Sequence, residues 1–131
     1  MLKRTIQLIT ILSLVSALTA CSPRPSSDAS CKIALLLPET KTARYETQDL
    51  PNFKHRLTEL GFNEQHLIYN NANQDAATQQ QQAEAALTNG ATVMVLDPVD
   101  SNAAAKIADL AKSKHVPVIS YDRLINGSDG V

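Results

Sequence analysis

Short apolar runs that recur between helix-like segments are the feature that most constrains how this chain of 131 residues can fold. Three of these runs, residues 33–37, 92–96 and 116–120, are almost continuously apolar, which is typical of strands buried on both faces. A weaker run at 67–69 lies between the first two. Because strands of this kind need helices over both sheet faces, the runs predict a parallel sheet.

Helical periodicity fills the three intervals between the runs. The first helix is expected from about residue 46 to 60, with Pro51 in its first turn and Gly61 as its C-cap. The second is expected over 74–89, with Gly90 as its stop, and the third from a cap at Asp100 or Ser101 to about residue 113. The order is therefore βαβαβαβ, a Rossmann-like α/β fold with right-handed crossovers.

The packing faces of these helices follow from the same spacing. In the second helix we expect a low-profile packing face and a solvated Gln79–Gln82 run on the other side. That packing face would consist of Ala77, Ala83, Ala86 and Leu87. In the third helix the residues expected to face the sheet are Ala104, Ile107, Ala108 and Ala111.

The first twenty residues have the composition of an export signal. Lys3 and Arg4 precede an apolar stretch that is shorter than the ~20 residues a membrane-spanning helix needs. The residues that follow, Leu18-Thr19-Ala20-Cys21, resemble a bacterial lipoprotein box, which implies lipidation of Cys21 and a membrane-anchored, extracytoplasmic protein. The alternative is a secreted protein with a disulfide between Cys21 and Cys31.

The chain thus divides into a signal segment (1–20), a Ser/Pro-rich tether (21–31) and one folded domain (32–131). A net charge of −1 argues against nucleic acid as a partner, since phosphate binding needs clustered Lys and Arg. No dinucleotide, nucleoside triphosphate or nucleophile-elbow motif is present. The three histidines, His55, His66 and His115, lack metal-ligand spacing, so we expect no metal, no cofactor and no catalytic residue.

Polar residues follow three of the predicted strands, in segments 39–45, 97–100 and 121–123. Ligands of open parallel sheets bind outside the carboxyl ends of the strands, so these segments predict the site. The adjacent Asp122 and Arg123 suit a neutral polyol, because one accepts and the other donates hydrogen bonds in a fixed geometry. The alternative is an ordinary ion pair at the strand end.

Four segments together resemble a known family: 32–37, Ala43-Arg44-Tyr45, 90–96 and 116–125. They are similar to the N-terminal part of type I periplasmic sugar-binding proteins, in the branch that binds xylose and several other monosaccharides. The resemblance implies that Asp122, Arg123 and Arg44 hydrogen-bond a sugar on which Tyr45 stacks. Tyr45 departs from the Trp usual in close xylose binders. Lys41 and Thr42, in the same loop as Glu39, are weaker candidates.

The resemblance implies a binding protein, not an enzyme, that captures a monosaccharide such as D-xylose and delivers it to an ABC permease in the membrane. It covers about a third of a family member, so we expect a fragment of one lobe, with its last strand at an open sheet edge. One alternative is a sugar sensor that presents its ligand to a receptor or sensor kinase. Another is a secreted Rossmann-like enzyme that acts on a sugar.

Overall fold

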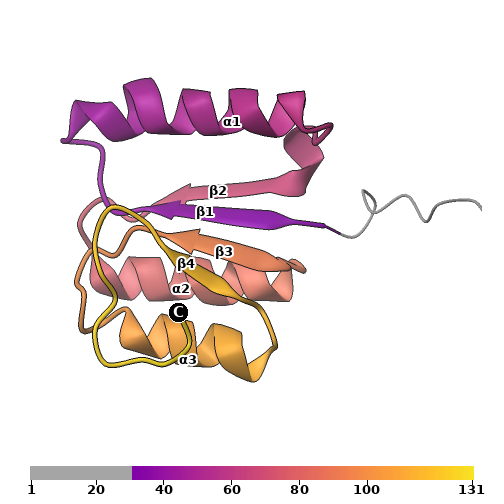
Figure 1. The fold of residues 1–131 in the computed structure, drawn as a ribbon. Helices are drawn as coiled ribbons and strands as arrows, with labels where there is room; N and C mark the ends of the chain where they lie inside the picture. The colour runs from indigo at the N-terminus through magenta and orange to yellow at the C-terminus, as the bar shows by residue number, and fades with distance from the viewer. Residues whose placement is uncertain (1–30) are drawn as a thin grey trace, which may run out of the picture.

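The computed structural model describes residues 31–131, which form one layered α/β unit (Figure 1). Its strands are β1 (Ile33–Leu37), β2 (Leu67–Asn71), β3 (Val93–Leu96) and β4 (Val118–Ser120). Its helices are η2 (Tyr45–Asp49, a π-helix), α1 (Leu50–Glu59), η3 (Glu64–His66, a 3₁₀-helix), α2 (Ala76–Thr88) and α3 (Ala105–Ser113). The predicted signal segment, Cys21 and all of the tether but Cys31 lie outside the described residues.

The four strands form one parallel sheet in the order β2-β1-β3-β4, which confirms the predicted fold class. From β1 the chain first adds β2 on one side and then β3 on the other. The strand order therefore reverses between β1 and β3. This is the point at which open parallel sheets leave a crevice beyond their carboxyl ends, so it positions the site described below.

Helices cover the sheet on both faces, with α1 on one face and α2 and α3 on the other (Figure 1). The buried strand β1 serves both faces, because successive side chains of a strand point in opposite directions. Leu35 and Leu37 pack in the cluster with Leu57 of α1. Ala34 and Leu36 pack in the cluster beneath α2 and α3.

The packing face of α2 differs from the expectation at two positions. Ala77 is exposed, whereas Gln79, expected in solvent, is only 1% exposed. The spacing explains the error, because residues 79, 83 and 86 share one face at intervals of four and three while residue 77 does not. The packing face is therefore Gln79, Ala83, Ala86 and Leu87. The expected face of α3 is confirmed, since all four of its residues are buried.

The first helix begins one residue earlier than expected and is wound as a π-helix up to Asp49. Pro51 lies in the first turn of α1, as predicted, and cannot donate a backbone hydrogen bond. The N–H of Leu50 reaches back to the Tyr45 carbonyl in the wider π pattern. The π-helix is fastened to β2 through Glu46, which accepts hydrogen bonds from the Tyr69 hydroxyl and the Asn71 amide.

Two other boundaries also move inward. The predicted cap Asp100 does accept backbone hydrogen bonds, from Asn102 at 2.9 Å and Ala103 at 2.7 Å, but these close a turn that precedes α3. Regular helix begins only at Ala105. The last strand is shorter than expected because Pro117 has no N–H for the ladder, so regular pairing starts at Val118.

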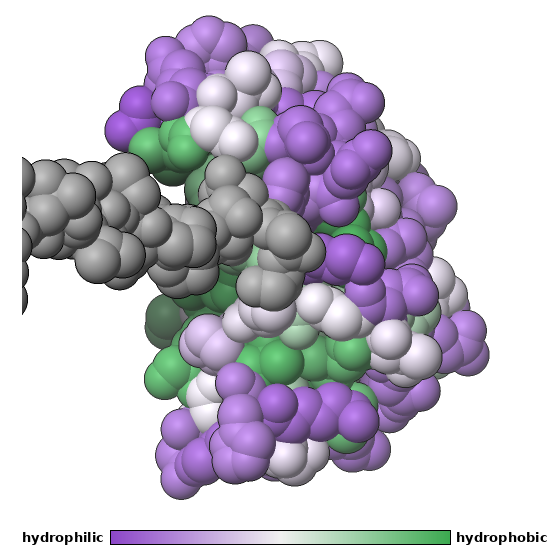
Figure 2. Space-filling view, turned by 90° about the vertical axis from the view of Figure 1, so that its right-hand side faces the viewer, coloured by the Kyte–Doolittle hydropathy of each residue, from purple (hydrophilic) through white to green (hydrophobic). Residues whose placement is uncertain are grey.

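Strand β4 lies at one edge of the described sheet, as expected. Its Ile119 is 53% exposed, since α1 covers the other end of that sheet face. Figure 2 shows apolar surface between the polar outer faces of the molecule. Among the described residues no helix has the length and apolar character needed to cross a membrane.

Candidate binding site

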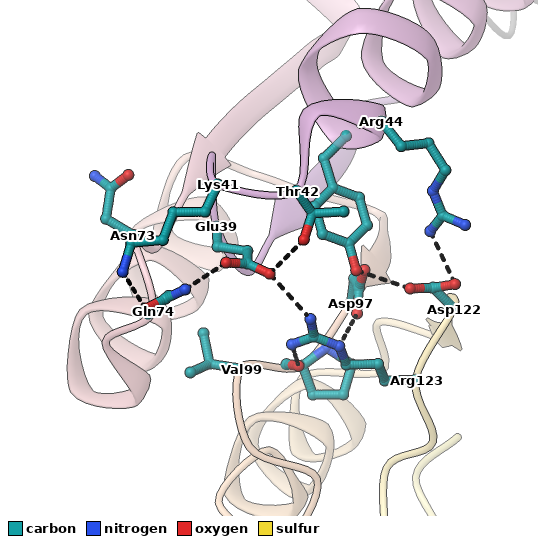
Figure 3. Close-up of polar contacts among 12 residues, drawn as sticks. Glu39, Lys41, Thr42, Arg44, Asn73, Gln74, Asp97, Val99, Asp122 and Arg123 are labelled. Carbon is teal, nitrogen blue, oxygen red and sulfur yellow. Dashed lines mark hydrogen bonds and ion pairs between the residues drawn. The ribbon is translucent and has the colours of Figure 1, made fainter.

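The carboxyl ends of β1, β3 and β4 bring together the polar side chains that the sequence predicted (Figure 3). The segment after β1 supplies Glu39, Thr42, Arg44 and Tyr45; the turn after β3 supplies Asp97; and the chain after β4 supplies Asp122 and Arg123. These segments are distant in sequence but converge because the parallel strands all end at the same side of the sheet.

Asp122 is the centre of one half of the cluster. It accepts from an Arg44 Nη at 2.8 Å and from the Tyr45 hydroxyl at 2.8 Å. These two hydrogen bonds lower the pKa of the Asp122 carboxyl. Its side chain stays 30% exposed and that of Arg44 47% exposed, so both can reach a ligand.

Tyr45 does not offer a ring face to a ligand in this structure. The residue is 2% exposed and packs in the apolar cluster beneath α1. Burial and the hydrogen bond to Asp122 raise the pKa of its hydroxyl. In this structure the buried ring therefore has no free face for the stacking that the resemblance implied, and its contact with the rim is the hydrogen bond from its hydroxyl to Asp122.

Arg123 forms the other half of the cluster and is held by two different strand ends. One Nη donates to the Pro98 carbonyl at 3.1 Å, and the other lies 3.4 Å from Glu39 Oε1. Its Nε is 3.8 Å from Asp97 Oδ1.

The neighbours Asp122 and Arg123 do not pair with each other; each forms an ion pair with a residue of the segment after β1, Asp122 with Arg44 and Arg123 with Glu39. Asp122 has a φ of 58°, in the left-handed region that Asp tolerates better than most residues, and this turn sends the two side chains to separate partners.

The weaker candidates Lys41 and Thr42 do not contact Arg123 but belong to the hydrogen-bond chain that ends at its partner Glu39. Thr42 donates to Glu39 Oε1 at 2.7 Å, and the Gln74 amide donates to the other Glu39 oxygen. These bonds lower the pKa of Glu39. Lys41 Nζ donates to Gln74 Oε1 at 3.2 Å. Thr42 thus contacts the carboxylate that faces Arg123 directly, whereas Lys41 contacts it only through Gln74.

Asp97 was one of the polar residues at the predicted rim, but its burial was not foreseen. It is fully buried, and neither carboxylate oxygen has a hydrogen-bond partner among the described residues. Burial raises its pKa to about 6. The one sequence signal for it was an acidic residue placed directly after a buried strand.

The arrangement suits recognition of hydroxyl groups. The cluster offers arginine donors and a carboxylate acceptor that are partly exposed and already held in place. A cavity of about 310 Å³ adjoins Arg123, lined by Pro38, Glu39, Gln74, Val99 and Arg123. Within residues 31–131 no group of three or more His, Cys, Asp or Glu side chains could hold a metal ion.

Residues 33–131 match the family described as periplasmic binding protein domain. The chain belongs to the periplasmic binding protein family. Members of this family bind substrates and are not enzymes, and the family implies an extracytoplasmic location.

Named relatives are consistent with this assignment. The chain is 29% identical over 119 residues to the D-xylose-binding periplasmic protein of Haemophilus influenzae, covering 91% of this chain and 34% of that protein.

Two solved structures share the fold of this periplasmic binding protein. An ABC transporter solute binding protein from Clostridium phytofermentans with bound β-D-glucose has a TM-score of 0.69 and 29% identity, covering 76% of this chain and 29% of that one. A carbohydrate transporter solute binding protein from Chloroflexus aurantiacus in complex with D-glucose has a TM-score of 0.70 and 31% identity, covering 77% and 28%. The chain spans about a third of the length of these relatives.

Proposed function

We propose that the protein captures a monosaccharide outside the cytoplasm for delivery to an ABC permease. The observation that carries this proposal is the polar cluster beyond the carboxyl ends of β1, β3 and β4. There Arg44, Asp122 and Arg123 present partly exposed hydrogen-bonding groups that are already held in place. Planar guanidinium and carboxylate groups match pairs of neighbouring sugar hydroxyls. In this proposal Arg44, Asp122 and Arg123 touch the sugar, while Tyr45, Lys41 and Thr42 support them.

D-xylose is the first sugar to test, because the Haemophilus influenzae relative is named for it. The glucose bound to both solved relatives makes D-glucose the second, and galactose, arabinose and ribose complete the series. The decisive measurement is calorimetric titration of the protein expressed from its complete gene.

We expect Arg123→Ala to weaken sugar affinity by at least about tenfold, since hydrogen bonds to charged groups contribute about 1.5–3 kcal/mol. Arg56→Ala is the matched control, because Arg56 is an exposed arginine on α1 whose ion-pair partner, among residues 31–131, is Glu59 alone. A protein that binds none of the five sugars, or an Arg123→Ala variant that binds as well as the parent, would contradict the proposal.

We further propose that Cys21 carries a lipid that anchors the domain at the membrane through the tether. Cys31 serves as the control, because it is half-buried, packs against the cluster beneath α1 and has no disulfide partner within residues 31–131. In cells fed a labelled fatty acid, Cys21→Ser should abolish labelling and release the protein from the membrane fraction, while Cys31→Ser should change neither. Labelling that survives Cys21→Ser would refute lipidation at this residue.

A further inference from the structure

Gln79 is a buried amide on a helix face otherwise made of small apolar residues. It is 1% exposed, and both the nitrogen and the oxygen of its side-chain amide form hydrogen bonds. Its Nε2 donates to the Asp97 carbonyl at 2.8 Å, and its Oε1 accepts from the Val99 N–H at 2.9 Å. Both partners are backbone groups of the turn that follows β3, so the amide replaces backbone pairing that this turn lacks.

The two hydrogen bonds fall on either side of Pro98. Pro98 has no N–H of its own, and its carbonyl accepts the 3.1 Å hydrogen bond from Arg123. Asp97, the residue before it, places its carboxylate 3.8 Å from the Nε of the same arginine. The Gln79 amide therefore binds the backbone on both sides of Pro98, whose carbonyl accepts from the Arg123 guanidinium. Gln79 itself is buried and does not line the cavity beside Arg123.

We propose that Gln79 is a positioning residue for sugar binding, which fixes the turn 97–99 and through Pro98 holds the Arg123 guanidinium ready for a hydroxyl. The inference rests on the proposed function of Arg123. A free arginine side chain loses much conformational freedom when it binds a ligand. Holding it beforehand removes that cost from the binding step, which is the physical basis of preorganisation.

A double-mutant cycle with the complete protein tests this role, with D-xylose and D-glucose as probes. Gln79→Met keeps the length of the side chain but removes both hydrogen bonds, and we expect it to weaken affinity by about tenfold, equivalent to ~1.4 kcal/mol. Gln81→Met, on the exposed side of the same glutamine run, should leave affinity unchanged. In an Arg123→Ala background, Gln79→Met should cost nothing further. An equal loss in both backgrounds would overturn the positioning role.

Should Gln79→Met fail to fold, Gln79→Glu serves in the same cycle at pH 7.5. A carboxylate at this position keeps an acceptor for the Val99 N–H but has no donor for the Asp97 carbonyl.

A second measurement needs no ligand and separates this inference from the proposed function. We expect the Arg123 Nη–H protons in the NMR spectrum, which include the donor to the Pro98 carbonyl, to exchange with water several-fold faster in Gln79→Met than in the parent or in Gln81→Met. Unchanged exchange would overturn the positioning role whether or not sugar binds. Faster exchange combined with no sugar binding in any variant would instead overturn the proposed function, and with it the role of Gln79 in sugar binding.

Discussion

Asp97 combines complete burial with carboxylate oxygens that lack a hydrogen-bond partner in the described part of the chain. Arg123 forms an ion pair with it, but the Arg123 Nε at 3.8 Å from Asp97 Oδ1 is too far for a hydrogen bond. Burial of the charged form is unfavourable, which raises the Asp97 pKa to about 6 from its ordinary value near 3.8. The neighbouring carboxyls Asp122 and Glu39 have lowered pKa values, because hydrogen bonds stabilise their charged forms.

These shifts act on stability in opposite directions. Between about pH 4 and pH 6 the folded protein binds more protons at Asp97 than the unfolded chain does, so this residue makes folding less favourable as pH rises. Asp122 and Glu39 do the reverse. Their charged forms stabilise the fold above the pKa that each group has in the unfolded chain, and this stabilisation is lost as the pH falls through the lower pKa of the folded state.

Replacing Asp97 with Asn should isolate its effect. Asp97→Asn should gain stability relative to the parent as pH rises from 4 to 7, by up to about 3 kcal/mol at ~1.4 kcal/mol per pKa unit. Urea unfolding of both proteins at pH 4.5 and pH 7.5 measures the difference. A stability difference that is the same at both pH values would show that Asp97 has an ordinary pKa.

At the scale of single residues, the sequence predicted the identity of the rim but not its pairings. Asp122 and Arg123 were found as neighbours, and the structure gives them different partners because of the left-handed turn at Asp122. Tyr45 was expected to face a ligand and is buried instead. Neither outcome is visible in residue type or spacing, because both depend on where the π-helix meets the chain after β4.

At the scale of elements, α2 and α3 lie close to the sheet because their inner faces are made of alanine. Ala83 and Ala86 of α2 and Ala108 of α3 are all fully buried in one cluster with Leu36 of β1. Small side chains let the helices approach the sheet, and a dense interior of this kind leaves no room for a larger side chain.

The corrected face of α2 gives a direct test with a matched pair of substitutions. Ala83→Leu should lower the free energy of unfolding by about 1–3 kcal/mol through overpacking. Ala77→Leu, one exposed position on the same helix, should change it by no more than about 0.5 kcal/mol. Thermal or urea unfolding of the two variants decides the question. A loss from Ala77→Leu as large as that from Ala83→Leu would mean that Ala77 packs against the sheet, as first expected from the sequence.

At the scale of the whole molecule, the site is an open surface at one edge of a single sheet. The partly exposed side chains of Arg44, Asp122 and Arg123 meet solvent directly, whereas their supports Tyr45 and Asp97 are buried. The chain matches about a third of the length of its named relatives, so the activity of the complete protein is a proposal that the titrations above address.

The parallel α/β fold, the three segments that supply the site and the family resemblance could all be predicted from the residues alone. These features depend on local periodicity and on short motifs, which are written along the chain. The pairing of side chains across the site became clear only from the folded chain. The buried carboxylate of Asp97, the inward ring of Tyr45 and the amide of Gln79 that encloses Pro98 all arise from contacts between residues far apart in sequence. Such contacts depend on packing geometry, which residue spacing alone does not encode.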